Sequence, residues 1–126
     1  KSVGSLPFGG TSPRGVRVVH EDGTVLADDA RRAGNIVTKG LGLMFRRSVP
    51  GDALVFPFSQ AATRRLHMVF VPFDIDAVWL AEGRVERVDR LAAWTGRGAA
   101  RADCVVEMPA GAADEVAVGD RLRVEE

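Results

Sequence analysis

The chain has 126 residues, enough for one domain that buries a core without disulfides or metals. Seventeen basic and seventeen acidic side chains give a formal net charge of zero, which argues against a broad nucleic-acid-binding surface. No apolar run approaches the roughly 18 residues of a membrane-spanning helix, so we expect no membrane span. From the neutral charge we also expect no nucleic-acid partner.

Cys104 is the only cysteine, which excludes an intrachain disulfide and a cysteine-based zinc cluster, and we expect no cofactor and no metal. Its valine neighbours predict a buried, inert thiol. Cysteine usage favours the cytoplasm, and an exported protein with a removed leader is the alternative because the chain starts at Lys1. Residues 1–15 read as a flexible lead or vector remnant, and residues 16–126 as one β-rich domain.

Two tight turns predict β-hairpins. Asp22-Gly23 separates the apolar runs 16–19 and 24–27, and Glu82-Gly83 leads into residues 84–91. Glycine supplies the positive φ that such turns require. His20, beside the first turn, is expected to be solvated.

Two segments suggest short helices. In residues 38–47, apolar side chains at positions 41, 44 and 45 follow helical spacing. Residues 109–118 are rich in small side chains and predict a short helix or a wide turn.

The remaining pattern is that of strands. Residues 53–58 form a buried strand, residues 59–65 a polar loop, and residues 66–71 alternate in polarity. In residues 73–79 the apolar side chains share one face, with Asp74 and Asp76 opposite. With further strands near the C-terminus, about seven in all, the sequence predicts a mostly β, α+β domain: a compact antiparallel β-barrel or sandwich-like fold with one or two short helices.

Four motifs in the same order carry a resemblance to a known family. They are Gly-Leu-Met-Phe-Arg at 42–46, Pro-Phe-Asp-Ile at 72–75, Val-Glu-Met-Pro-Ala-Gly at 106–111 and Gly-Asp-Arg-Leu at 119–122. The chain resembles domain of unknown function 192, which implies a small β-rich domain, often exported in bacteria, without an established activity. Members commonly have Trp-Met-Lys-Asn where this chain has Leu-His-Met-Val at 66–69, so His67 is a local polar substitute.

His67 is the natural candidate for a general acid or base, because the pKa of histidine lies near neutrality. Asp74 and Asp76, two positions apart, could hold a cation or work as an acid/base pair with His67. The plainer readings are a surface histidine and a solvated carboxylate face, with Asp74 bonding the backbone after Pro72.

Arg46 could bind a carboxylate or phosphate; the alternatives are a charge at the end of a helix that complements its dipole, or a salt bridge to Glu107. Trp94, within a glycine-flanked loop, could stack on a ligand or plug the end of a barrel. We take Arg46, His67, Asp74, Trp94 and Glu107 as the candidate ligand-binding residues.

Three functions follow, and an enzyme is not the preferred one. The first is a non-catalytic binding module for a small polar ligand or a protein partner. The second is a hydrolase- or lyase-like enzyme that uses His67 with Asp74 or Asp76. The third is a protein-interaction module that uses a sheet edge near Pro72 or the apolar segment 56–58.

Overall fold

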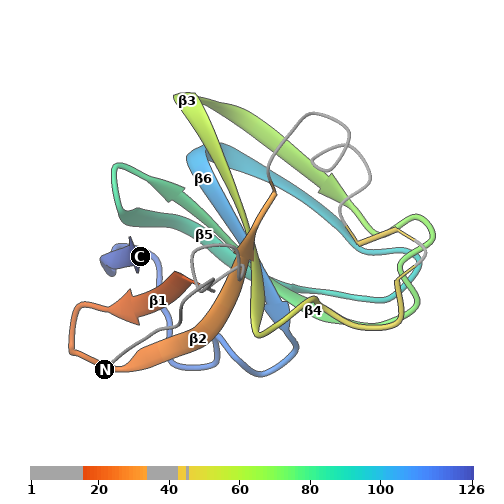
Figure 1. Ribbon diagram of the computed structural model, residues 1–126. Helices are drawn as coiled ribbons and strands as arrows, with labels where there is room; N and C mark the ends of the chain where they lie inside the picture. The colour runs from red at the N-terminus through yellow and green to blue at the C-terminus, as the bar shows by residue number, and fades with distance from the viewer. Residues whose placement is uncertain (1–15, 34–42, 45) are drawn as a thin grey trace.

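The computed structural model describes residues 16–33, 43–44 and 46–126, and in them the protein is all-β (Figure 1). One seven-stranded sheet has the spatial order β5-β4-β6-β3-β2-β1-β7. The strands are β1 (Val16–His20), β2 (Val25–Arg32), β3 (Ala53–His67), β4 (Ile75–Ala81), β5 (Arg84–Leu91), β6 (Arg97–Pro109) and β7 (Leu122–Glu125).

The sheet is mixed and curls into a half-barrel. All paired strands are antiparallel except β2 and β3, which run parallel from Ala30 opposite Ala53. The outermost strands meet at one end, where Arg84 of β5 bridges to Arg121 just before β7. Backbone hydrogen bonds reinforce this contact, with the Val85 N–H donating to the Asp120 carbonyl at 2.8 Å. The edges of the sheet are therefore joined at that end, and β7, which leads to the C-terminus, pairs with β1 (Figure 1).

Each face of the sheet carries its own apolar cluster, because successive side chains of a strand point to opposite faces. The inner cluster, inside the half-barrel, draws on every strand and includes Val18, Val55, Val78, Leu80, Val106, Met108 and Leu122. The outer cluster covers the other face of β3, β4 and β6 and includes Leu43, Leu54, Phe56, Met68, Ile75, Trp79 and Val105. Trp79 is fully buried there, and its indole N–H donates to the Arg64 carbonyl at 2.9 Å.

Both predicted hairpin turns are confirmed. Gly23 has a φ of 94° between β1 and β2, and Glu82 and Gly83 have φ values of 52° and 80° between β4 and β5. In the turn between β4 and β5, positive φ at both central residues matches the twist of the flanking strands. The Asp103 carboxylate accepts the Glu82 N–H at 3.0 Å and so helps to hold this unusual backbone conformation.

The α+β prediction is wrong, because no helix occurs in the described part of the chain. Most of the first predicted helix, residues 38–47, lies outside the described residues, and residues 43–44 form a turn. The helix alternative for residues 109–118 is replaced by successive turns, with separate bonds such as the Ala112 N–H to the Pro109 carbonyl at 3.0 Å. Gly111, at a φ of 101°, interrupts any helical run.

The polar loop predicted at residues 59–65 is also wrong, since β3 continues through it to His67, paired with β6. The register of the β3–β6 pair shifts between Pro57 and Ala62. Such an irregularity allows a proline, which lacks an N–H, to lie in a central strand. Beyond this point the two strands form an arm whose side chains are mostly exposed or half-buried, so apolar alternation is weak there.

Candidate functional site

Glu107 is the most unusual ionisable group of the described chain. It lies on β6, opposite Leu54 of β3 and Ala77 of β4, and both of these neighbours belong to the outer cluster. Only 7% of Glu107 is exposed. A carboxyl group is thus held by two central strands among apolar side chains, on the outer face of the sheet.

No hydrogen bond or ion pair to the Glu107 carboxyl is formed by residues 16–33, 43–44 and 46–126. Burial alone raises its pKa from the ordinary 4.5 to about 7. Buried polar groups in folded proteins are almost always partnered, because an unmet hydrogen-bonding group in an apolar setting is costly. Strongly perturbed carboxyl groups of this kind cluster at functional sites.

Near neutral pH, Glu107 therefore exists in both protonation states. The protonated form can donate one hydrogen bond, and the ionised form accepts hydrogen bonds and complements a cation. A single buried carboxyl group of this kind is suited to binding a ligand that offers hydrogen-bond donors or a positive charge.

Arg46 lies in a segment of the chain that contributes side chains to the outer cluster. Leu43 and Val49, on either side of it in the chain, pack in the outer cluster. The Arg46 side chain is exposed, and its backbone N–H donates to the Leu43 carbonyl at 3.1 Å. The expected salt bridge to Glu107 is not formed, since burial is the sole influence on the pKa of Glu107.

Asp76 is buried and ion-paired, so the expectation of a solvated carboxylate is wrong for it. It is 3% exposed and accepts four hydrogen bonds: two from Arg90, one from the Gly111 N–H and one from the Ala113 N–H, at 2.8–3.4 Å. Burial pushes the pKa of Asp76 upward, but the Arg90 guanidinium and the two N–H donors outweigh it, and the net pKa is lowered. These contacts fasten the turns after β6 to β4.

His67, Asp74 and Trp94 lie at one end of the molecule: His67 ends β3, Asp74 is in the loop before β4, and Trp94 is in the loop between β5 and β6. The loops are joined by backbone bonds from the Met68 N–H to the Gly96 carbonyl and from the Trp94 N–H to the Val71 carbonyl, both at 2.9 Å. Asp74 accepts the Ala93 N–H at 2.8 Å, so it bonds the backbone of the loop after β5 rather than the local backbone after Pro72 that the sequence suggested. The His67 ring accepts the Val69 N–H at 3.3 Å, and within the described chain no hydrogen bond links it to Asp74 or Asp76.

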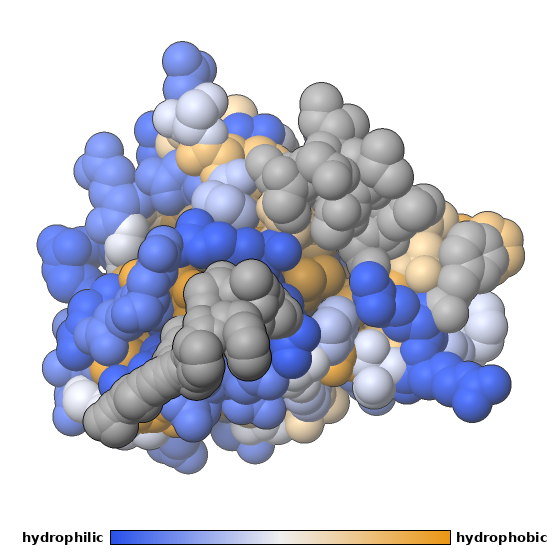
Figure 2. All heavy atoms as spheres, viewed as in Figure 1, coloured by the Kyte–Doolittle hydropathy of each residue, from blue (hydrophilic) through white to orange (hydrophobic). Residues whose placement is uncertain are grey.

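Trp94 projects from this end of the molecule, with 56% of its surface exposed and a φ of 68°. Val69 and Phe70 beside it are 46% and 48% exposed, and Phe70 also has a positive φ, 61°. Apolar colour gathers at the right-hand end of the molecule, where these loops lie (Figure 2). Positive φ is uncommon for bulky side chains, so the backbone is held against its preference at both aromatic residues.

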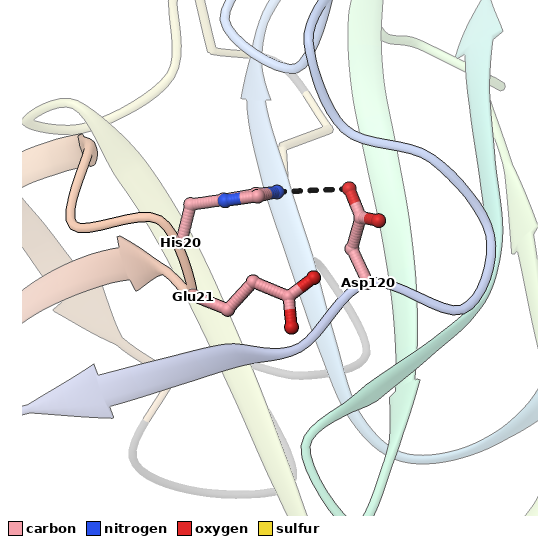
Figure 3. Close-up of side chains that lie close together, drawn as sticks. All are labelled: His20, Glu21 and Asp120. Carbon is pink, nitrogen blue, oxygen red and sulfur yellow. Dashed lines mark hydrogen bonds and ion pairs between the residues drawn. The ribbon is translucent and has the colours of Figure 1, made fainter.

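A third set of polar groups was missed by sequence reasoning. His20, Glu21 and Asp120 each place one potential ligand atom within 4.8 Å of the others (Figure 3). His20 is 8% exposed, contrary to the solvated histidine expected. Its partner Asp120 is 100 positions away, so no local signal could have found the pair.

The hydrogen bonds of His20 and Asp120 have a structural role, because they join the turn after β1 to the segment before β7. Nε2 lies 2.8 Å from Asp120 Oδ2, and Nδ1 accepts the Asp22 N–H at 3.0 Å. Asp120 Oδ2 also accepts the Ala117 N–H at 2.9 Å. The hydrogen bond to Asp120 raises the pKa of His20, and desolvation opposes it only in part. Because both ring nitrogens are engaged, neither is available to a metal without breaking these contacts.

Among the described residues, no helix is long and apolar enough to cross a membrane. The apolar segment 56–58, one of the two places expected for a protein-interaction surface, lies in central strand β3, and Phe56 is only 5% exposed. The other, Pro72, lies between β3 and β4 and belongs to no strand, so it does not form a sheet edge.

Comparisons with known proteins agree with the fold. A crystal structure described as a putative transcription regulator from Sinorhizobium meliloti superposes with a TM-score of 0.70 at 22% identity, covering 86% of this chain and 91% of that one. A protein of unknown function from Novosphingobium aromaticivorans also gives 0.70, at 21% identity, covering 86% and 82%. No curated protein matches the sequence significantly. The family model DUF192, described as Uncharacterized ACR, matches residues 17–124, and the chain belongs to this family.

Proposed function

We propose that this protein is a non-catalytic binding module whose small polar ligand is recognised by Glu107 on the outer face of the sheet. The observation that carries the proposal is a carboxyl group that is 7% exposed and has no partner among the described residues. A ligand with an ammonium group or several N–H or O–H donors would supply the missing partner. Arg46 is the proposed second contact, through an anionic or carbonyl group of the same ligand.

Recognition fits this site better than catalysis does. An acid/base mechanism needs a second group within hydrogen-bond reach. Asp76 is occupied by four donors, and Asp74 bonds the backbone of the loop beside it. His67 with either aspartate therefore has less support as a catalytic pair than Glu107 has as a ligand contact.

A thermal-shift screen tests this function. Protein at pH 6 and pH 8 would be mixed with small amines, amino acids, polyols and sugars, because a ligand that binds only the folded state raises its melting temperature. A hit should disappear in Glu107→Gln, which keeps the shape of the side chain and removes its charge. Glu86→Gln, on the exposed surface of β5, is the matched control and should keep the hit.

A hit that survives in Glu107→Gln would contradict the proposed site. A flat screen with well-folded protein would favour the second candidate function, a protein-interaction surface formed by Val69, Phe70 and Trp94. That surface predicts a concentration-dependent solution mass that Trp94→Ser lowers, with a second copy of the chain as the first partner to test.

A further inference from the structure

The inner face of the half-barrel contains a cavity of about 300 Å³, on the side of the sheet opposite Glu107. Its floor is a row of neighbours in register, Leu80 of β4, Cys104 of β6 and Pro57 of β3, with Val55 beside them. The facing wall is β7, through Leu122 and Val124. The floor and this wall are apolar.

The cavity follows from the way the strands end. The β3–β6 register shifts directly after Pro57 opposite Cys104, so the regular inner face of the barrel stops at that row. On the opposite side, β7 has only four residues with which to cover it. The mouths of β-barrels are common ligand sites, and 300 Å³ is at the lower end of known pocket volumes.

Two arginines line the same cavity, Arg32 of β2 and Arg123 of β7. Each is paired with a nearby acidic side chain: Arg32 Nη2 lies 2.7 Å from Glu126, and Arg123 bonds Glu125. The Arg32 and Arg123 side chains are 40% and 60% exposed, and that of Glu126 is 75% exposed. Exposed ion pairs of this kind are weak, so another carboxylate can take the place of these glutamates.

We propose that this cavity binds a small amphipathic anion, a short aliphatic carboxylate whose chain fills the apolar interior and whose carboxylate bonds Arg32 and Arg123. Volume and apolar lining select a short hydrocarbon body, and the two guanidinium groups select a negative head group by charge complementarity. Glu125 and Glu126 hold these guanidinium groups in the absence of the anion.

A chain-length series tests this proposal on the intact protein. Affinities of butanoate, hexanoate, octanoate and decanoate would be measured by calorimetry, with the alkylamines of equal length as controls. We expect affinity to rise about fourfold per added methylene until the cavity is full. Octanoate should bind at least tenfold more tightly than octylamine. Equal binding of the two would overturn the anion site.

Variants locate the ligand. Arg32→Gln and Arg123→Gln should each weaken octanoate binding about tenfold, whereas Arg101→Gln, on the exposed arm of β6, should leave it unchanged. Cys104→Leu should reduce binding by filling the cavity. Because the arginines are partly exposed, their variants remain informative even if Cys104→Leu fails to fold.

The single cysteine gives an independent readout, since Cys104 lines the cavity. Cys104 is partly exposed rather than fully buried, and burial raises the pKa of its thiol to about 11, so labelling with methyl methanethiosulfonate would be run at about pH 9 under conditions where the ligand-free protein reacts. Octanoate should slow this labelling in proportion to occupancy. Unchanged labelling at saturating octanoate would place the ligand elsewhere and overturn the proposal. Glu107→Gln should bind octanoate as the parent does, so this site and the Glu107 site can fail separately.

Discussion

Asp76 and Glu107 are two buried carboxyl groups on neighbouring strands, and their environments are opposite. Residues 76 and 77 of β4 lie opposite residues 108 and 107 of β6, so the two groups are nearly adjacent but point to opposite faces of the sheet. Their exposures are similar, 3% and 7%. Asp76 accepts four hydrogen bonds, whereas Glu107 receives none from the rest of the described chain.

The difference shows that burial alone does not fix the role of a carboxylate. Partners keep Asp76 ionised and lower its pKa, and their effect is to fasten a turn to the sheet. Without partners, burial raises the pKa of Glu107 to about 7, at a cost to the folded state that a bound ligand can relieve. The donors therefore separate a carboxyl group with a structural role from the one that we propose contacts a ligand.

The largest expected effect comes from removing Asp76. Asp76→Ala leaves the Gly111 and Ala113 N–H groups without their acceptor and breaks the pair with Arg90. We expect a loss of about 3 kcal/mol or more in the free energy of unfolding, measured in urea. Asp114→Ala, at the exposed end of the same network, should cost far less. Equal losses of stability in the two variants would contradict the contrast between Asp76 and Glu107, because the buried hydrogen bonds of Asp76 would then contribute no more than an exposed ion pair.

Glu107 predicts a stability that changes with pH in a defined direction. Its pKa is higher in the folded protein than the ordinary 4.5, so the folded state holds the extra proton. Its contribution is complete below about pH 4.5 and is lost as pH rises through about 7, by about 3 kcal/mol in all.

The measurement is the difference in unfolding free energy between the parent protein and Glu107→Gln from pH 4.5 to pH 8. The variant should gain on the parent as pH rises, while Glu86→Gln follows the parent throughout. A constant difference would mean that Glu107 is already partnered.

The smallest expected effect concerns His20. Like Asp76, it is a buried ionisable side chain whose polar atoms are all hydrogen-bonded. The hydrogen bond to Asp120 raises the pKa of the ring above 6.5, so His20 stabilises the fold below that pH and less so as pH rises through its folded pKa. An NMR titration should show a pKa above 6.5 that falls in Asp120→Asn. An unchanged pKa of His20 in the variant would mean that the hydrogen bond to Asp120 does not determine the protonation of the ring.

Local features were predictable from sequence because local chemistry decides them. The turns at Gly23 and Glu82-Gly83, the face shared by Ile75, Ala77 and Trp79, and the family motifs all follow from neighbouring residues. The sequence also placed Glu107 among the candidates, but it assigned Arg46 as the partner.

The rest was decided by contacts between distant segments. The polar half of β3 is a strand because β6 pairs with it, and the parallel β2–β3 pair depends on register rather than on composition. His20 and Asp120 meet because β1 pairs with β7. By itself the sequence determined the two hairpin turns, the alternation in residues 75–79 and the family, since these depend on residues close in the sequence. The strand that alternation predicted through residues 66–71 is wrong, because β3 ends at His67 and residues 69–70 form a turn. Tertiary structure decided which carboxylates found donors, because the donors come from other strands and turns.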